Sequence, residues 1–252
     1  MFLTLKKSQI ILLLISFFIA TTSVADDKQL ESALNNSIRD DDDRARDAAR
    51  KPAQTLKFFE VNPDSKVLEL IPGAGWYTKI LGNYLREDGQ LYVAVGAKAE
   101  RLKLKQNKLE HVKIIGEDFK LESSELHPGI RNVTGNDFSE SGFDVVLTFR
   151  NMHNFTEPGR AVINKAVFKA LKPGGIYGVI DHTKRHMQSY DDERWRRVDP
   201  VQIIKELLDI GFEFEQYSDI HARPADELIY DSTDDSINRN SDRFTLKFRK
   251  PL

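Results

Sequence analysis

The chain has 252 residues, and its 37 lysines and arginines against 39 aspartates and glutamates give a formal net charge of -2. This balance offers no polycationic surface, so nucleic acid is not an expected partner. Hydrophobic residues make up 40% of the chain, as in a soluble protein with one domain of about 200–250 residues. The absence of cysteine excludes disulfides, thiolate metal sites and cysteine nucleophiles.

The first 25 residues have the pattern of a signal peptide. Lys6 and Lys7 precede an apolar run from Ile10 to Ala20, and small residues before position 26 suit cleavage after Ala25. The run is much shorter than the ~20 residues of a membrane-spanning helix, so a retained anchor is the less favoured alternative. We therefore expect a periplasmic or secreted protein with no stable membrane span after signal removal.

Residues 26–46 are polar and charged, and they include the run Asp40-Asp41-Asp42-Asp43. Such a segment buries little apolar surface, which predicts a solvated, flexible leader. The folded domain is expected to cover residues 47–252. Its first element is a helix with Pro52 in the first turn, where the missing N–H and fixed φ of proline cost little.

Strand and helix patterns then alternate. Buried strands are predicted at 66–71, 91–95 and 112–115, with helices between them that carry Tyr77, Ile80, Leu81, Tyr84 and Leu85, and then Leu102 and Leu109. The second half continues with a strand at 143–149, a loop at 150–157, a helix bearing Ile163, Val167 and Leu171, a turn at 172–175, a strand at 176–181 and a helix from Pro200 to Gly211. This alternation predicts a parallel sheet with helices on both faces.

The last two predicted strands cover 212–217 and 244–248. No convincing helical pattern separates them. They are therefore expected to pair antiparallel, as strands of a hairpin do and strands joined by a parallel crossover cannot.

The turn Pro72-Gly73-Ala74-Gly75 after the first strand is the most informative local feature. Its glycines let the backbone approach a ligand, and the following helix offers free N–H groups to a polar or anionic group. A dinucleotide fingerprint would need a third glycine where Thr78 stands, which disfavours NAD and FAD. On this motif alone, a strand-to-helix turn without a ligand is an equal alternative.

Combined with Glu69 in the first strand, the Leu171–Gly175 turn and the closing strands, this turn resembles the first motif of class I S-adenosylmethionine (SAM)-dependent methyltransferases. Over most of its length the chain looks like an exported bacterial subfamily of predicted methyltransferases. The residues of that closer likeness are Arg50-Lys51-Pro52, Glu69 to Thr78, Thr148 to Asn154, Leu171 to Gly175, and Asp242-Arg243-Phe244. The resemblance implies an α/β, Rossmann-like seven-stranded sheet, mostly parallel with the last strand antiparallel, and helices on both faces.

SAM is the cofactor that the resemblance implies. Its methionine and ribose would lie against Glu69, Pro72, Gly73, Ala74, Gly75 and Tyr77, and its adenine against Asp118 and Phe119. A carboxylate such as Glu69 can hold the ammonium group of SAM, and a phenyl ring offers an apolar face to a purine. The second strand ends in Val95-Gly96-Ala97, without a carboxylate for the ribose hydroxyls, and Glu100 is the nearest one.

The segment Arg150-Asn151-Met152-His153-Asn154 leaves the fourth strand at the edge where open α/β sheets bind ligands. His153 is a candidate general base, Arg150 a candidate for binding an acceptor carboxylate or phosphate, and Asn151 a further catalytic candidate. The alternative is that the asparagines satisfy loop backbone and His153 packs against the strand end. Asp181-His182, at the end of the fifth strand, either faces the same cleft or caps the strand.

Three functions fit these patterns. The first is SAM-dependent methyl transfer to a small-molecule or envelope acceptor. The second is a non-catalytic exported protein that binds a small ligand on the same fold, which the missing carboxylate after Val95 favours. The third is a purely structural envelope protein. No metal site is expected, because His182 and His186 lack a third ligand. The sequence assigns no oligomeric state.

Overall fold

The computed structural model describes residues 26–252, so the predicted signal peptide lies outside the described residues. Its strands are β1 (Lys66–Leu70), β2 (Gln90–Ala94), β3 (Lys113–Ile115), β4 (Lys120–Ser123), β5 (Arg131–Thr134), β6 (Phe143–Phe149), β7 (Leu171–His182), β8 (Glu213–Ser218) and β9 (Arg243–Arg249). Its helices are α2 (Asp41–Ala45), α3 (Asp47–Arg50), α4 (Pro52–Phe58), α5 (Trp76–Tyr84), α6 (Ala99–Leu102), α7 (Glu157–Ala170) and α8 (Pro200–Ile210), with short 3-10 helices η1 (Met152–Asn154), η2 (Asp192–Arg194) and η3 (Asp235–Ile237). Among residues 26–252, no helix is long and apolar enough to cross a membrane.

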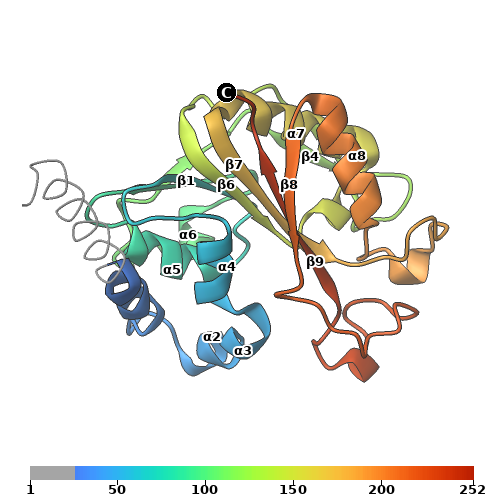
Figure 1. Ribbon diagram of the computed structural model, residues 1–252, viewed down its shortest axis with the longest axis horizontal. Coiled ribbons are helices and arrows are strands. Elements are labelled where there is room, and N and C mark those ends of the chain that lie inside the picture. Colours follow the sequence, from blue (N-terminus) through green and yellow to red (C-terminus); the bar gives the residue numbers. More distant parts are fainter. Residues whose placement is uncertain (1–25) are drawn as a thin grey trace, which may run out of the picture.

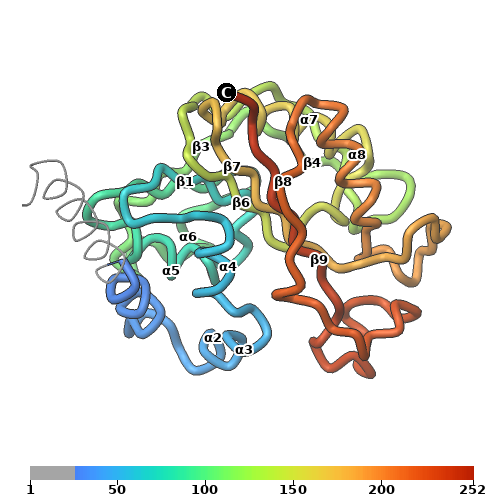
Figure 2. Tube along the Cα trace, viewed as in Figure 1, coloured from blue at the N-terminus to red at the C-terminus, as the bar shows by residue number. Residues whose placement is uncertain are grey.

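Seven strands form one sheet in the order β3-β2-β1-β6-β7-β9-β8. The pairs from β3 to β7 are parallel, and β9 runs antiparallel to both of its neighbours, β7 and β8. Figures 1 and 2 show β8 and β9 beside β7, although the helix α8 and a long loop separate them in sequence. This topology confirms the predicted methyltransferase-type sheet and its antiparallel last strand.

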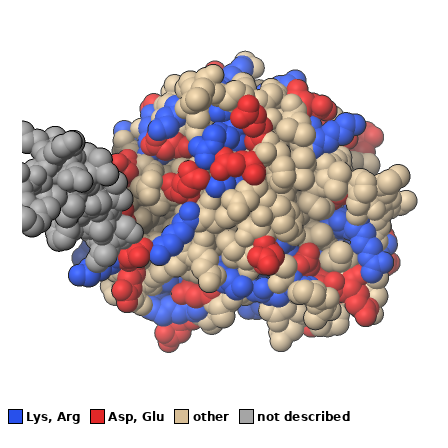
Figure 3. Space-filling view, viewed as in Figure 1, with Lys and Arg blue, Asp and Glu red and all other residues tan. Residues whose placement is uncertain are grey.

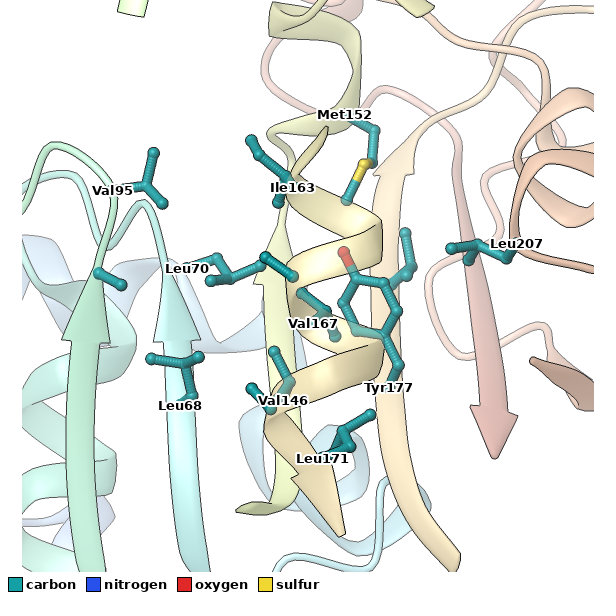
Figure 4. Packing of buried hydrophobic residues seen from close by; sticks show 14 of the residues in the cluster. Leu68, Leu70, Val95, Val146, Met152, Ile163, Val167, Leu171, Tyr177 and Leu207 are labelled. Atoms are coloured by element: carbon teal, nitrogen blue, oxygen red, sulfur yellow. The ribbon is translucent and has the colours of Figure 1, made fainter. Parts of the chain in front are cut away.

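Helices cover both faces of the sheet because side chains alternate between faces along each strand. Leu68 and Leu70 of β1 share a core cluster with Ile163 and Val167 of α7, whereas Val67 joins a second cluster with residues of α4 and α5. Figure 4 shows α7 over this first face, with its side chains directed at Val146 and Tyr177 on the strands.

The structure differs from the predicted leader over residues 26–46. Residues 26–34 are helical, and Leu30 and Ala33 are 3% and 2% exposed in the second core cluster. These few apolar positions on one helical face give the segment a surface to bury, so the folded part begins before residue 47. The run Asp40–Asp43 starts α2, where Asp40 caps the helix and acidic side chains favour its N-terminus.

Two further segments differ from the sequence-based expectation. The predicted helix carrying Leu102 and Leu109 is reduced to α6, because Lys103 adopts a left-handed conformation (φ 51°) that ends it. The segment Lys172–Gly175 belongs to the start of β7 instead of a turn, with Leu171 paired to Phe143 across a register shift. The small antiparallel sheet of β4 and β5 was not predicted.

Candidate functional site at the β1–β6 switch point

The order of the strands places the ends of β1 and β6 side by side, with Leu70 opposite Thr148. The order of the strands reverses at this point: β2 and β3 lie on one side of β1, and β6 and the strands that follow lie on the other side. Open α/β sheets bind ligands at the carboxyl edge of such a switch point. Asn151 ties the two ends together, because its amide donates to the carbonyl of Leu70 and to the hydroxyl of Thr148, both at 3.2 Å. The two segments singled out in the sequence therefore meet.

The glycine turn after β1 leaves the backbone open on one side. Gly73 has φ 61°, and a Cβ added there would meet no atom within 4 Å. Gly75 has φ 84° and precedes the first residue of α5, where its own Cβ would approach Leu102. Pro72 is buried and Ala74 is exposed. The open space above Gly73 and the start of α5 suit a polar ligand group.

Glu69 lies inside β1, 2% exposed, on the face covered by α5. The hydroxyl of Thr78 donates to its Oε2 atom at 2.6 Å. Burial raises the pKa of Glu69 to about 7, while the Thr78 hydrogen bond and the positive charge of Arg50 act in the opposite direction. A cationic ligand group near the turn would stabilise the ionised form of Glu69 and offset the cost of burying its charge.

Tyr77 packs between α5 and the end of β6. Its ring stacks on Phe149 with centroids 3.7 Å apart, and its hydroxyl donates to the carbonyl of Arg50 at 3.3 Å. Burial raises the pKa of Tyr77 to about 12. Tyr77 is thus buried behind the glycine turn, with one face of its ring already stacked on protein.

The two residues assigned to adenine lie beyond β3. Asp118 is exposed and accepts a hydrogen bond from the backbone N–H of Asn136 at 3.0 Å. Phe119 is 8% exposed and packs against Phe138, with centroids 4.8 Å apart. One face of the Phe119 ring is therefore covered by protein. Glu100 is exposed in the first turn of α6.

His153 forms a buried pair with Asp181. The Nδ1 atom of His153 lies 2.6 Å from Oδ1 of Asp181, and the backbone N–H of His153 donates to Oδ2 at 3.0 Å. Asp181 is fully buried and His153 is 8% exposed. When the carboxylate accepts a hydrogen bond from Nδ1–H, the lone pair of the neutral imidazole is on Nε2, which is the arrangement of a general base.

A second histidine stands beside this pair. The ring of His182 lies 5.5 Å from that of His153, and its Nδ1 atom is 2.8 Å from the Ser241 hydroxyl. Burial, followed by electrostatic repulsion from the neighbouring His153 and Arg243, holds the pKa of His182 well below its usual range. His186 contacts Asp199 instead, and residues 26–252 contain no group of three or more potential metal ligands.

Comparison with known proteins identifies the fold. A SAM-dependent methyltransferase from Aquifex aeolicus superposes with a TM-score of 0.54 at 17% identity, over 84% of this chain and 95% of the other. The chain has the fold of the class I SAM-dependent methyltransferases. A putative methyltransferase from Bacillus halodurans (TM-score 0.52, 13% identity, 81% of this chain and 100% of the other) also shares this methyltransferase fold, as does the [4+2]-cyclase SpnF (0.54, 16%, 81% of each chain).

Sequence comparison gives shorter matches. The chain is 29% identical over 124 residues to the ubiquinone/menaquinone biosynthesis C-methyltransferase UbiE of Wigglesworthia glossinidia brevipalpis, covering 49% of this chain and 45% of the relative. It is 28% identical over 129 residues to an uncharacterized methyltransferase of Synechocystis, covering 50% and 51%. The chain thus spans about half the length of the curated relatives that it matches. No family model matches it.

Two contacts of the site were missed in the sequence. Thr78 was noted only as a mismatch to the dinucleotide fingerprint, yet its hydroxyl holds Glu69. The pairing of Asp181 with His153 joins residues 28 positions apart. The spacing of Glu69 in a strand and Thr78 in the next helix carries no signal by itself. The position of Asp181 at a strand end allowed it to face the same cleft, which its contact with His153 bears out.

Proposed function

We propose that the protein transfers a methyl group from SAM to an unidentified small-molecule or envelope acceptor. The observation that carries this proposal is the buried Glu69 at the open glycine turn, with the His153–Asp181 pair at the neighbouring strand end. SAM, when bound, supplies an electrophilic methyl group on its sulfonium. The names of the Wigglesworthia and Synechocystis relatives support methyl transfer.

The residues would divide the work as follows. Glu69 binds the cofactor ammonium, and the backbone at Gly73 leaves room for the methionine part of the cofactor. Nε2 of His153 accepts the proton that the acceptor loses when its nucleophile bonds to the methyl carbon, and Asp181 stabilises the resulting imidazolium. Asn151 fixes the geometry between the two loops. Because no covalent enzyme intermediate is required, orientation supplies much of the acceleration.

Replacement of Gly73 by valine tests the cofactor site. The side chain would enter the open space above the turn, and we expect the affinity for S-adenosylhomocysteine to fall at least tenfold, about 1.4 kcal/mol, by calorimetry. Gly142→Val is the matched control. Gly142 also has a positive φ (76°) and open surroundings, but it lies just before the first residue of β6, at the edge of the sheet away from the candidate site. Both variants carry comparable backbone strain, so equal losses of affinity would refute the assignment.

Replacement of His153 by glutamine tests the proton acceptor. Once a turned-over acceptor is found, we expect the rate of labelled methyl transfer to fall about 100-fold, while affinity for S-adenosylhomocysteine stays unchanged. Asp181→Asn should lower the rate as well, because the amide cannot stabilise an imidazolium. A variant with wild-type rates across pH 6–9 would exclude His153 from proton transfer.

The alternative, a non-catalytic ligand-binding protein, is favoured by one observation. The end of β2 at Val95-Gly96 carries no carboxylate, and Glu100 is exposed in the following helix. Only the first proposal requires SAM binding and methyl transfer, whereas the alternative allows a nucleoside-like or different small ligand without turnover. Release of S-adenosylhomocysteine from SAM in a screen of acceptors supports the first, and the absence of binding of both SAM and S-adenosylhomocysteine by calorimetry supports the alternative.

We also propose that residues 1–25 direct export. The support is the sequence pattern of Lys6 and Lys7 before a short apolar run and the small residues that end at Ala25. Fusion of residues 1–30 to a reporter that is active only outside the cytoplasm should give signal, and Lys6→Glu with Lys7→Glu should reduce it. Equal signal from a fusion without residues 1–25 would overturn export.

A further inference from the structure

Four arginines, here called the arginine cluster, come together next to the candidate site: Arg46, Arg50, Arg150 and Arg243. Arg150 follows β6, Arg243 opens β9 at the same edge of the sheet, and Arg46 and Arg50 flank and end α3. The guanidinium of Arg243 reaches the Ala49 carbonyl at 3.4 Å. Figure 1 shows α3 and the start of β9 on the same lower side of the molecule.

In the part of the chain that the structure describes, no member of the arginine cluster forms an ion pair with a carboxylate. Within residues 26–252, arginine ion pairs are made by other arginines, such as Arg160 with Glu206 and Arg197 with Asp226. The Nε atoms of Arg46, Arg50 and Arg243 are buried without a hydrogen-bond partner, and Arg243 is only 4% exposed. A buried guanidinium without a counter-charge costs stability, so this arrangement is expected where a ligand completes it.

The nearest carboxylates are already engaged. Asp181 attracts Arg150 electrostatically, but it already accepts hydrogen bonds from His153. Glu69 interacts electrostatically with Arg50, but it already accepts a hydrogen bond from the Thr78 hydroxyl. Burial, followed by the repulsion of the neighbouring arginines, lowers the pKa of Arg50 to about 9 and of Arg243 to about 10. Arg150 follows β6 three residues before His153, and the guanidinium of Arg50 lies 4.3 Å from the ring centroid of Trp76, the first residue of α5. The positive charge therefore lies at the same edge of the sheet as the proposed proton acceptor and the proposed cofactor site.

The cofactor itself does not match this charge. SAM carries a single carboxylate, so bound SAM could compensate at most one of the four arginines. The chain as a whole has a formal net charge of -2, and Figure 3 shows basic and acidic residues interspersed over the visible face.

We propose that the arginine cluster binds a phosphate or phosphonate group on the methyl acceptor, an inference that rests on the proposed function. Guanidinium groups bind tetrahedral oxyanions through paired, charge-assisted N–H···O hydrogen bonds, and several of them match a dianion better than a single carboxylate. An anion held by Arg150 and Arg243 places the remainder of the acceptor beside His153. The acceptor class is thus a phosphorylated compound with a hydroxyl, amine or acidic carbon as nucleophile.

The experiment uses inorganic phosphate as the probe, titrated by calorimetry into the purified chain saturated with S-adenosylhomocysteine, with chloride at equal ionic strength as the blank. We expect phosphate binding that weakens at least tenfold in Arg243→Gln and in Arg150→Gln. Arg249→Gln is the matched control, since Arg249 lies on the same strand but pairs with Glu60 and Glu215 at its far end. Thermal melts of each variant establish that it is folded.

The outcomes separate the two proposals. Phosphate binding that is lost in the two cluster variants and kept in Arg249→Gln supports the oxyanion site. The absence of phosphate binding to the wild-type chain overturns it. A fall of S-adenosylhomocysteine affinity in the cluster variants, with no effect on phosphate, also overturns it, because the arginines then hold the cofactor carboxylate. If the chain binds phosphate but not S-adenosylhomocysteine, the oxyanion site stands and the proposed methyl transfer fails.

Discussion

Replacement of Glu69 by glutamine should stabilise the protein above pH 7 and weaken its binding of S-adenosylhomocysteine. The folded chain raises the pKa of this carboxyl from 4.5 to about 7. It therefore binds the proton more tightly than the unfolded chain does, and the free energy of unfolding falls as pH rises from 4.5 to about 7. The full penalty, ~3 kcal/mol, is present above pH 7. Glutamine keeps an acceptor for Thr78 and carries no charge to desolvate.

Urea denaturation at pH 5 and pH 9 measures the stability effect. We expect the glutamine variant to exceed the wild type by ~3 kcal/mol at pH 9, with a much smaller difference at pH 5. Thr78→Val is the control, since loss of the hydroxyl removes the bond that favours the ionised carboxyl and should increase the wild-type pH dependence. Parallel stability curves for wild type and Glu69→Gln would show that Glu69 does not titrate in this range.

Above pH 7, where Glu69→Gln should be more stable than the wild type, it should also bind S-adenosylhomocysteine more weakly. Binding of a ligand ammonium requires ionised Glu69, so the wild-type affinity should fall as pH drops below about 7, whereas that of Glu69→Gln should be low and flat. Calorimetry with S-adenosylhomocysteine at pH 6, 7 and 8 checks this. Unchanged affinity in the variant would remove Glu69 from the cofactor site.

Replacement of Asp226 by alanine should destabilise the protein by about 3–5 kcal/mol. Asp226 accepts two hydrogen bonds from Arg197, at 3.0 and 2.8 Å, and their side chains are 3% and 0% exposed. Asp226 also accepts from the backbone N–H of Asp242 at 2.6 Å, just before β9. Alanine leaves the Arg197 charge buried and unpaired.

Urea denaturation measures this loss, and two variants control for it. Asp231→Ala breaks the neighbouring ion pair with Arg196 and removes the acceptor of two Thr233 hydrogen bonds. It should cost less than Asp226→Ala, because the side chain of Arg196 is 38% exposed and stays solvated. The double variant Asp226→Leu with Arg197→Met removes both buried charges and should recover a large part of the loss. A cost for Asp226→Ala no larger than that of Asp231→Ala would contradict the expectation.

Much of the fold could be predicted because hydrophobic periodicity is local. The strand at Phe143–Phe149 was predicted with its observed bounds, β1 differs by one residue at its end, and β2 is shifted by one residue at both ends. The left-handed turn at Gly73 and Gly75 follows from residues that tolerate positive φ. The parallel pairing follows from the alternation of strands and helices, whereas the seven-stranded arrangement was implied by the family resemblance.

The remaining features depend on contacts between distant segments. Residues 26–34 fold because Leu30 and Ala33 meet the second core cluster, which the charged composition of the segment conceals. The buried neighbours of His153 become visible only when β7 lies beside β6, and Arg50 and Arg243 become one cluster only when α3 reaches the start of β9. Composition and residue spacing do not reveal these contacts between distant segments.

The position of β9 has a consequence for folding. This strand is formed by residues near the carboxyl end, yet it lies between β7 and β8, with Phe244, Leu246 and Phe248 at 0% exposure. Until residues 243–249 are in place, β7 and β8 lack the strand that lies between them, so the sheet cannot close its hydrophobic core. Folding of the half of the sheet that contains β7 and β8 therefore depends on the segment that follows β8 in the sequence.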